Sequence, residues 1–304
     1  LDNSHVIETA IAGIRRDLPP RFYRQLPHLD GLGVPRVLAI AWLYVAHGDS
    51  AVSADGFREL VDGFQEVRPL RIGELWALPS ILRFVLVENL RRLAQRVARA
   101  REMRLLANRV ADLLAATPAG AETGLLSDHA VHAGDRTFAT QLLHRLRDGS
   151  QASSQALAWL EKELEAAGTD AEEITLGEHA NLSAGNVTTG NIVKGLRLVD
   201  DVDWTAWFET VSRIDRLLRE HSDFAALDFA SRDTYRRAIE KLAERAGREE
   251  FDVASEALER AGREKVDVGC VLVGLGRPAF ERALGYAAPF RDRLYRVWRA
   301  GGWV

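Results

Sequence analysis

The sequence predicts an all-α protein built from roughly ten or more helices. Ala, Leu, Arg and Glu dominate the composition, whereas prolines and aromatic residues are scarce, and this bias favours helices. Apolar residues recur at intervals of three and four along most of the chain, which is the period of an amphipathic helix. Only residues 266–273 could pass for a strand, and with no partner strand in the sequence a short buried helix is an equal alternative.

The composition excludes several classes of protein. A chain of 304 residues can bury a sizeable core in one or two domains, and 47% apolar with 28% charged residues is typical of a globular protein. The net charge of −4 gives no overall attraction to nucleic acid. The single cysteine, Cys270, excludes an internal disulfide and fits a reducing compartment.

No signal peptide and no apolar run long enough to cross a membrane is evident. The first residue is Leu1 rather than methionine. We therefore expect the chain to be a processed or excised piece of a longer protein.

Three helices are expected before residue 68. Asn3 or Ser4 can cap a first helix that runs to about residue 16. Residues 34–47 are apolar almost all round and predict a buried helix. A third helix is expected over residues 55–67.

The stretch from residue 68 to 117 is the one around which the chain is organised. Its first half is dense in large apolar residues, and its second half is an arginine-rich amphipathic helix. Pro79 predicts a short helix ending near Leu78 and a long helix over 80–116. The arginines form either a solvated face or a docking surface for an acidic partner or phosphate groups; they are Arg91, Arg92, Arg96, Arg99, Arg101, Arg104 and Arg109.

Residues 121–135 are rich in Gly, Ala and turn formers and predict a linker. The expected division is an amino-terminal helical subdomain, 1–120, and a second helical subdomain, 136–304. Within the second subdomain we expect helices over 136–147, 154–167, 204–220, 231–245 and 252–260. A further helix that carries Ile192 and Leu196 is expected after the polar stretch 181–191.

Three motifs could carry metal or nucleotide chemistry, and each has a simpler interpretation. Asp201 and Asp203 form the D-x-D pattern with which many nucleotide-sugar transferases hold a divalent cation, but acids at a helix start are favoured by its dipole. His129 and His132 have metal-ligand spacing without a third strong ligand nearby. Residues 273–278 lack the third glycine of a dinucleotide loop and predict a helix end followed by a new helix starting near a proline.

Two tryptophans precede a helical apolar stripe. Trp204 and Trp207 could stack on sugar rings beside the amides of Asn181, Asn186 and Asn191. Aromatic residues at helical spacing are usually buried in a core, which the sequence favours here. The candidate glucan contacts are Asn186, Trp204 and Trp207.

The carboxyl-terminal segment 289–304 mixes arginines with aromatic residues. Such segments flank the cytoplasmic end of a membrane helix or lie on an anionic surface, although an ordinary terminal helix remains an alternative. The candidate membrane or docking surface comprises Arg291, Arg293, Arg296, Trp298 and Arg299.

Four blocks of the sequence carry a family resemblance: 17–27, 73–94, 186–215 and 228–243. They resemble the amino-terminal region of cyclic β-1,2-glucan synthases, very large bacterial inner-membrane enzymes, and the likeness extends from about residue 1 to residue 299. None of these blocks is a catalytic motif.

In that family the resembling region precedes the first membrane helices. A membrane glycosyltransferase module that uses UDP-glucose follows, and cyclising and phosphorylase-like modules come later. The resemblance implies a position at the cytoplasmic face of the inner membrane, within a parent that needs UDP-glucose and a divalent cation. This chain has no Q-x-x-R-W motif, so no catalytic, cofactor-binding or metal-binding residue is assigned to it.

The resulting hypothesis is a non-catalytic helical scaffold or regulatory domain that docks on the glycosyltransferase module. Its expected partners are the other modules of the same polypeptide, with a glucan chain and an anionic membrane surface as further candidates and no nucleic acid. One alternative is a glucan-binding module that holds the growing chain. Another is a small helical carbohydrate-active enzyme using acids such as Glu74, Glu88 or Asp201.

Overall fold

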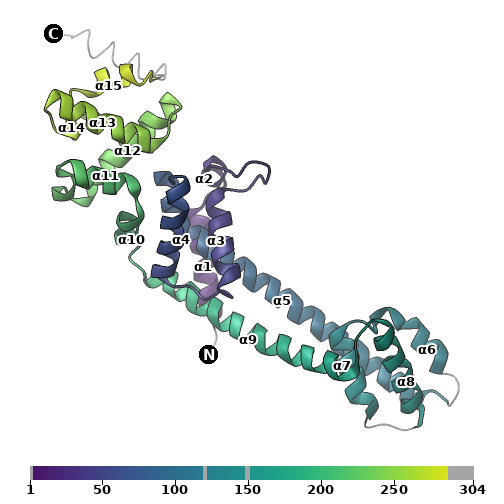
Figure 1. Ribbon diagram of the computed structural model, residues 1–304. Helices are drawn as coiled ribbons and strands as arrows, with labels where there is room; N and C mark the ends of the chain where they lie inside the picture. Colours follow the sequence, from purple (N-terminus) through teal and green to yellow (C-terminus); the bar gives the residue numbers. More distant parts are fainter. Residues whose placement is uncertain (1–2, 119–121, 148–150, 287–304) are drawn as a thin grey trace. The chain divides into compact units, whose positions relative to one another are not determined.

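The computed structural model describes residues 3–118, 122–147 and 151–286 (Figure 1). Over these residues it contains fifteen α-helices, two 3-10 turns and no strand, and the one β-bridge pairs His28 with Pro35. The predicted all-α class with more than ten helices is confirmed. Within the part of the chain that is described, none of the helices combines the length and the hydropathy that crossing a membrane requires.

The helices are α1 (Ser4–Asp17), α2 (Pro20–Gln25), α3 (Arg36–His47), α4 (Ala54–Val67), α5 (Ile72–Ala116), α6 (Glu122–Asp128), α7 (Arg136–Arg147), α8 (Gln151–Ala166), α9 (Ala171–Asp201), α10 (Trp204–Val211), α11 (Arg213–His221), α12 (Phe229–Ala246), α13 (Glu250–Glu264), α14 (Val268–Leu272) and α15 (Arg277–Ala283). The 3-10 turns are η1 (Ala130–His132) and η2 (Asp223–Ala226). Residues 268–272 are thus helical, which settles the strand-or-helix alternative.

Backbone contacts group the chain into two compact units. Unit 1 comprises residues 1–7, 48–51 and 85–196, and unit 2 comprises residues 8–47, 52–84 and 197–304. This grouping differs from the expected division at 121–135, because the two long helices α5 and α9 each contribute to both units.

The core of unit 1 lies where α6, α7 and α8 gather at the carboxyl-terminal end of α5 (Figure 1). Its buried side chains come from five helices and include Val110 and Leu114 of α5, Phe138 and Leu142 of α7, Leu160 of α8 and Ile174 of α9. Leu126 of α6 is buried in the same cluster. Residues 122–128, expected within a linker, therefore form a helix because Leu126 has a core to pack against.

Helix α9 is continuous through the polar stretch 181–191, where the helix was predicted to begin only afterwards, near Ile192. The polar side chains in this stretch find partners that suit a helix. Thr188 donates its hydroxyl to the Asp49 carboxylate at 2.7 Å, and Asn191 donates its amide to the Asp49 carbonyl at 3.0 Å. Tertiary contacts of this kind outweigh weak helix propensity.

Helix α5 is likewise continuous through Pro79, so the expected break after Leu78 is wrong. A proline inside a helix removes one backbone hydrogen bond and crowds the preceding turn. The neighbouring side chains Leu78, Ile81 and Leu82 are fully buried in unit 2. Their packing stabilises the helical path that proline alone would disfavour.

The first turn of α5 is fixed by a buried ion pair between Arg36 of α3 and Glu74. Both Glu74 oxygens accept from the Arg36 guanidinium, and one also accepts from the backbone N–H of Arg71 at 2.9 Å. Arg36 also donates to the Pro69 carbonyl at 2.9 Å. Glu74 is therefore a structural residue that joins the start of α5 to α3.

We predict that Glu74→Ala lowers the free energy of unfolding by about 3–5 kcal/mol, because Arg36 would stay buried without its counter-charge. Glu88→Ala is the matched control. Glu88 pairs with Arg91 and Arg92 on the exposed side of the same helix, where such pairs contribute less than about 1 kcal/mol. Urea unfolding of both variants gives the comparison, and equal losses would contradict a special role for the buried pair.

A second buried charge network organises the aromatic core of unit 2. The Arg236 side chain is fully buried, and its guanidinium donates to Asp215 at 3.1 Å and to Glu209 at 2.8 Å. It also lies over the rings of Phe208 and Phe229, at 5.0 and 5.2 Å from their centroids. The network joins α10, α11 and α12 around one cation, which both the acids and the aromatic faces stabilise.

Glu250, the first residue of α13, is buried beside the start of α5. Its carboxylate accepts from the backbone N–H of Ile72 at 2.7 Å. Burial disfavours the charged form and raises the pKa of Glu250 to about 7, and the nearby Glu240 acts in the same direction. The folded protein thus retains a proton here that the unfolded chain releases at lower pH.

This raised pKa predicts that the free energy of unfolding falls as pH rises from about 4.5 to 7, by an amount on the order of 3 kcal/mol. Glu250→Gln keeps an acceptor for Ile72 and cannot ionise, so its stability should lack this component. Urea unfolding of both proteins at pH 5 and pH 8 measures the difference. Parallel pH profiles for the two proteins would contradict the prediction.

Candidate functional site

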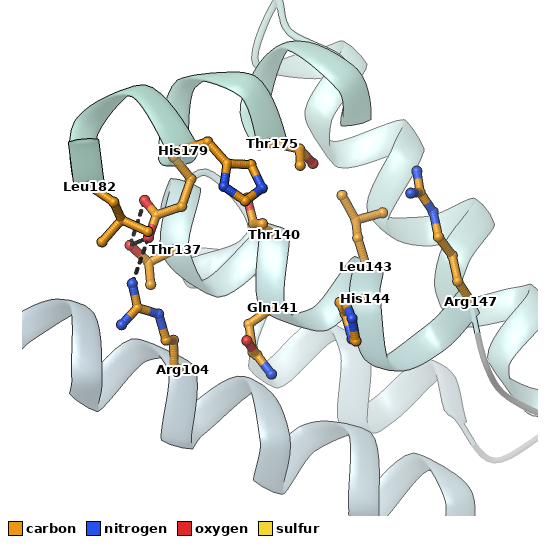
Figure 2. Close-up of a pocket in the computed structure, with 11 residues that line it drawn as sticks. Arg104, Thr137, Thr140, Gln141, Leu143, His144, Arg147, Thr175, His179 and Leu182 are labelled. Carbon is orange, nitrogen blue, oxygen red and sulfur yellow. Dashed lines mark hydrogen bonds and ion pairs between the residues drawn. The ribbon is translucent and has the colours of Figure 1, made fainter. Parts of the chain in front are cut away.

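A pocket of about 560 Å³ lies within unit 1, lined by α5, α7 and α9 (Figure 2). This volume is within the range of small-molecule sites. Helix α7 contributes one continuous stripe at helical spacing, Thr137, Thr140, Gln141, His144 and Arg147. Helix α9 contributes another, Thr175, Glu178, His179 and Leu182. Both faces are mainly polar, although they belong to packed helices.

Glu178 lines the pocket and is held by contacts from two helices. Its carboxylate is largely buried and accepts from the Thr137 hydroxyl at 3.1 Å to each oxygen. Arg104 of α5 donates to it at 3.0 Å, and Figure 2 shows these interactions as dashed lines. The charge of Glu178 is therefore neutralised by Arg104, and its orientation is fixed from two helices.

Other polar groups of the pocket have fewer internal partners. The hydroxyl oxygen of Thr140 is buried and has no hydrogen-bond partner among the described residues. The Gln141 amide donates to Asn108 at 3.0 Å, which orients the side chain toward α5. A buried hydroxyl without a partner costs free energy unless a ligand or water satisfies it.

The rim carries His144, Arg147 and His179, all exposed. Figure 2 shows Arg104 and Arg147 at opposite ends of the pocket, with His179 and Thr140 between them. Arg147 has no ion pair with any residue that the structure describes. Glu178 is the only carboxylate among the described lining residues.

The candidate glucan contacts differ in their surroundings. Trp207 is buried, stacks on Phe57 with ring centroids 5.7 Å apart, and donates its indole N–H to the Ala54 carbonyl at 3.2 Å. Trp204 is half-buried and donates to the Val199 carbonyl at 2.7 Å. These two residues belong to unit 2, whereas Asn186 is exposed in unit 1. Trp207 thus has the contacts of a core side chain.

The acidic and histidine motifs also have structural roles. Asp203 caps α10 by accepting from two backbone N–H groups of its first turn at 3.0 and 3.1 Å. His129 and His132 lie at η1 with ring centroids 6.3 Å apart. Across the described ranges, no three His, Cys, Asp or Glu side chains gather where they could hold a metal ion.

The carboxyl-terminal surface expected at Arg291, Arg293, Arg296, Trp298 and Arg299 lies outside the described residues. Its membrane or docking role stays a prediction.

The pocket residues were not predicted from the sequence, although the sequence of the helix over 136–147 contains a pattern that points to them. Polar residues at positions 137, 140, 141, 144 and 147 recur with the same period as the apolar stripe on the other side of that helix. This recurrence indicates a polar face opposite the apolar one. Which helix it faces depends on tertiary structure and is not evident from one segment.

We predict that Trp207→Ala lowers the free energy of unfolding by about 3–5 kcal/mol, because it leaves a cavity against Phe57. Asn186→Ala, on the exposed face of α9, should change it by less than about 0.5 kcal/mol. Chemical denaturation measures both values. A small loss for Trp207→Ala would return this residue to the candidates for ligand contact.

The described residues form an all-α protein with a pocket of about 560 Å³ in unit 1. A scan against protein-family models finds no match. Over its whole length the chain is 51% identical to part of the cyclic beta-(1,2)-glucan synthase NdvB of Rhizobium meliloti (strain 1021), and it spans 11% of that protein. The resemblance to a region of cyclic β-1,2-glucan synthases is therefore confirmed, and the chain is similar to a part of such a synthase.

Proposed function

We propose that this chain is a non-catalytic helical scaffold of a cyclic β-1,2-glucan synthase. In this proposal it docks on the membrane glycosyltransferase module, which forms glucan from UDP-glucose with a divalent cation. Docking takes place at the cytoplasmic face of the inner membrane, and the segment containing Arg291, Arg293, Arg296, Trp298 and Arg299 lies on the membrane surface.

The observation that carries the proposal is the 51% identity over all of the chain to a stretch amounting to 11% of the synthase. A segment of this size within so large an enzyme acts beside other modules. The helical fold without a strand in the described residues also differs from the mixed α/β domain expected of a processive glycosyltransferase.

The structural use of the acids supports a non-catalytic role. Glu74 forms a buried ion pair with Arg36. Glu88 pairs with Arg91 and Arg92, and Asp203 caps α10. Arginine pairing lowers the pKa of Glu88 to about 2, so this residue is unsuited to donate a proton near neutral pH. These contacts give Glu74 and Glu88, two of the acids named for the enzyme alternative, roles in ion pairs.

A surface suited to docking lies on α5. We call it the arginine groove; it is a depression of about 510 Å³ lined by Asn89, Arg92, Gln95, Arg96 and Arg99. These positions follow one helical stripe, and Arg96 and Arg99 are exposed. A linear row of guanidinium groups complements an acidic helix or loop and favours its association.

The test is to supply this chain as a separate polypeptide to a synthase that lacks it. The chain should bind the remaining synthase and raise its glucan synthesis from UDP-glucose, and the chain alone should release no UDP. Arg96→Glu/Arg99→Glu should weaken binding at least tenfold at low salt, because two attractive charges become repulsive.

Arg245→Glu/Arg263→Glu is the matched control, since it reverses two exposed arginines on α12 and α13 of unit 2. It should leave the affinity within about twofold, because neither residue lines the arginine groove. Equal weakening by both double variants would contradict docking through the arginine groove. UDP release by the isolated chain would contradict the non-catalytic role itself.

A further inference from the structure

The pocket lined by α5, α7 and α9 is not used in the proposed scaffold function. Two helices that pack together usually face each other with apolar side chains. Here the facing positions of α7 and α9 are occupied mainly by hydroxyl, amide, imidazole, carboxylate and guanidinium groups. Among them the hydroxyl of Thr140 is buried without a partner in the described residues, and such a group lowers stability unless a ligand or water satisfies it.

We propose that this pocket binds a small soluble phosphate monoester with a hydroxyl-bearing body. Arg147 and His144 contact the phosphate, and the unpartnered hydroxyl of Thr140 bonds to the body.

Charge selects the anionic part of the ligand. Glu178 is neutralised by Arg104 at 3.0 Å, and no second carboxylate lines the pocket within the described residues. The charge of Arg147 is therefore not compensated inside the site. His144 precedes Arg147 by three residues on α7, and side chains at that spacing lie together on a helix. A guanidinium beside an imidazole suits a phosphate, which accepts several charge-assisted hydrogen bonds.

Size and hydrogen bonding select the rest of the ligand. A volume of about 560 Å³ exceeds what an isolated phosphate fills. The Thr140 hydroxyl is buried without a partner among the described residues, and His179 lines the same pocket. Both groups can exchange hydrogen bonds with hydroxyls of a ligand. Leu143 and Leu182 contribute apolar side chains to the lining.

The test is calorimetric titration of the purified chain with glucose 6-phosphate, inorganic phosphate and glucose as probes. Glucose 6-phosphate should bind saturably with one site per chain. Inorganic phosphate should bind at least tenfold more weakly because it lacks the body, and glucose should bind more weakly still because it lacks the charge. Equal binding of glucose and glucose 6-phosphate would overturn the proposal, as would the absence of binding at millimolar concentrations.

Two variants separate a binding role from a structural one. Arg147→Gln should weaken glucose 6-phosphate binding at least tenfold. Arg145→Gln is the matched control on the same helix, and it should leave the affinity unchanged because Arg145 pairs with Asp112 instead of lining the pocket. Equal effects of the two substitutions would show nonspecific charge attraction and overturn the site.

Thr140→Val removes the unpartnered hydroxyl while keeping the shape of the side chain. It should weaken binding about fivefold and leave the melting temperature unchanged or raised, since no internal hydrogen bond is lost. Unchanged affinity would exclude this residue from the site.

A lipid headgroup is the other source of a phosphate monoester. Vesicles of phosphatidylcholine with phosphatidic acid distinguish it from a soluble ligand. Binding to these vesicles that depends on Arg147, without binding of glucose 6-phosphate, would overturn the soluble ligand and assign the pocket to a membrane surface.

Discussion

The pairing of buried charges is the constraint on which the packing of unit 2 depends. In unit 2 the fully buried Glu74 has the Arg36 guanidinium as its partner, and the fully buried Arg236 has Asp215 and Glu209. An isolated charge in either position would cost several kcal/mol, so these helices can pack only in the arrangement that brings the partners together. The first pair joins α3 to the start of α5, and the second joins α10, α11 and α12.

The same constraint separates structural charges from those available for function. Acids such as Glu74 and Glu209 are committed to arginines in the interior, and Glu178 is committed to Arg104 in the pocket of unit 1. Exposed cations without a described partner, such as Arg96 and Arg147, remain for external ligands. A list of charged residues taken from sequence cannot make this distinction, because it depends on which side chains meet across helices distant in the chain.

Much of the helical arrangement could be predicted from local patterns. The residue range 136–147 matches α7, and the predicted helix over 204–220 divides only at Ser212, whose hydroxyl caps α11 by accepting from the Asp215 N–H at 3.1 Å. The errors at Pro79 and at residues 181–191 share one cause: local propensity favours a break, and tertiary contacts outweigh it. The pocket could not be predicted, because it needs the facing stripes of two helices separated by α8.

Helix α7 shows how stability and binding can occupy opposite faces of one element. Phe138, Leu142 and Leu146 point into the apolar cluster of unit 1 and bury the surface that stabilises the helix. Thr140, His144 and Arg147 occupy the polar face toward α9 and contribute little to that core. Because folding depends on the first face, the second can retain an unpartnered hydroxyl and an uncompensated cation. Such groups are costly in a core and useful at a site that selects an anion.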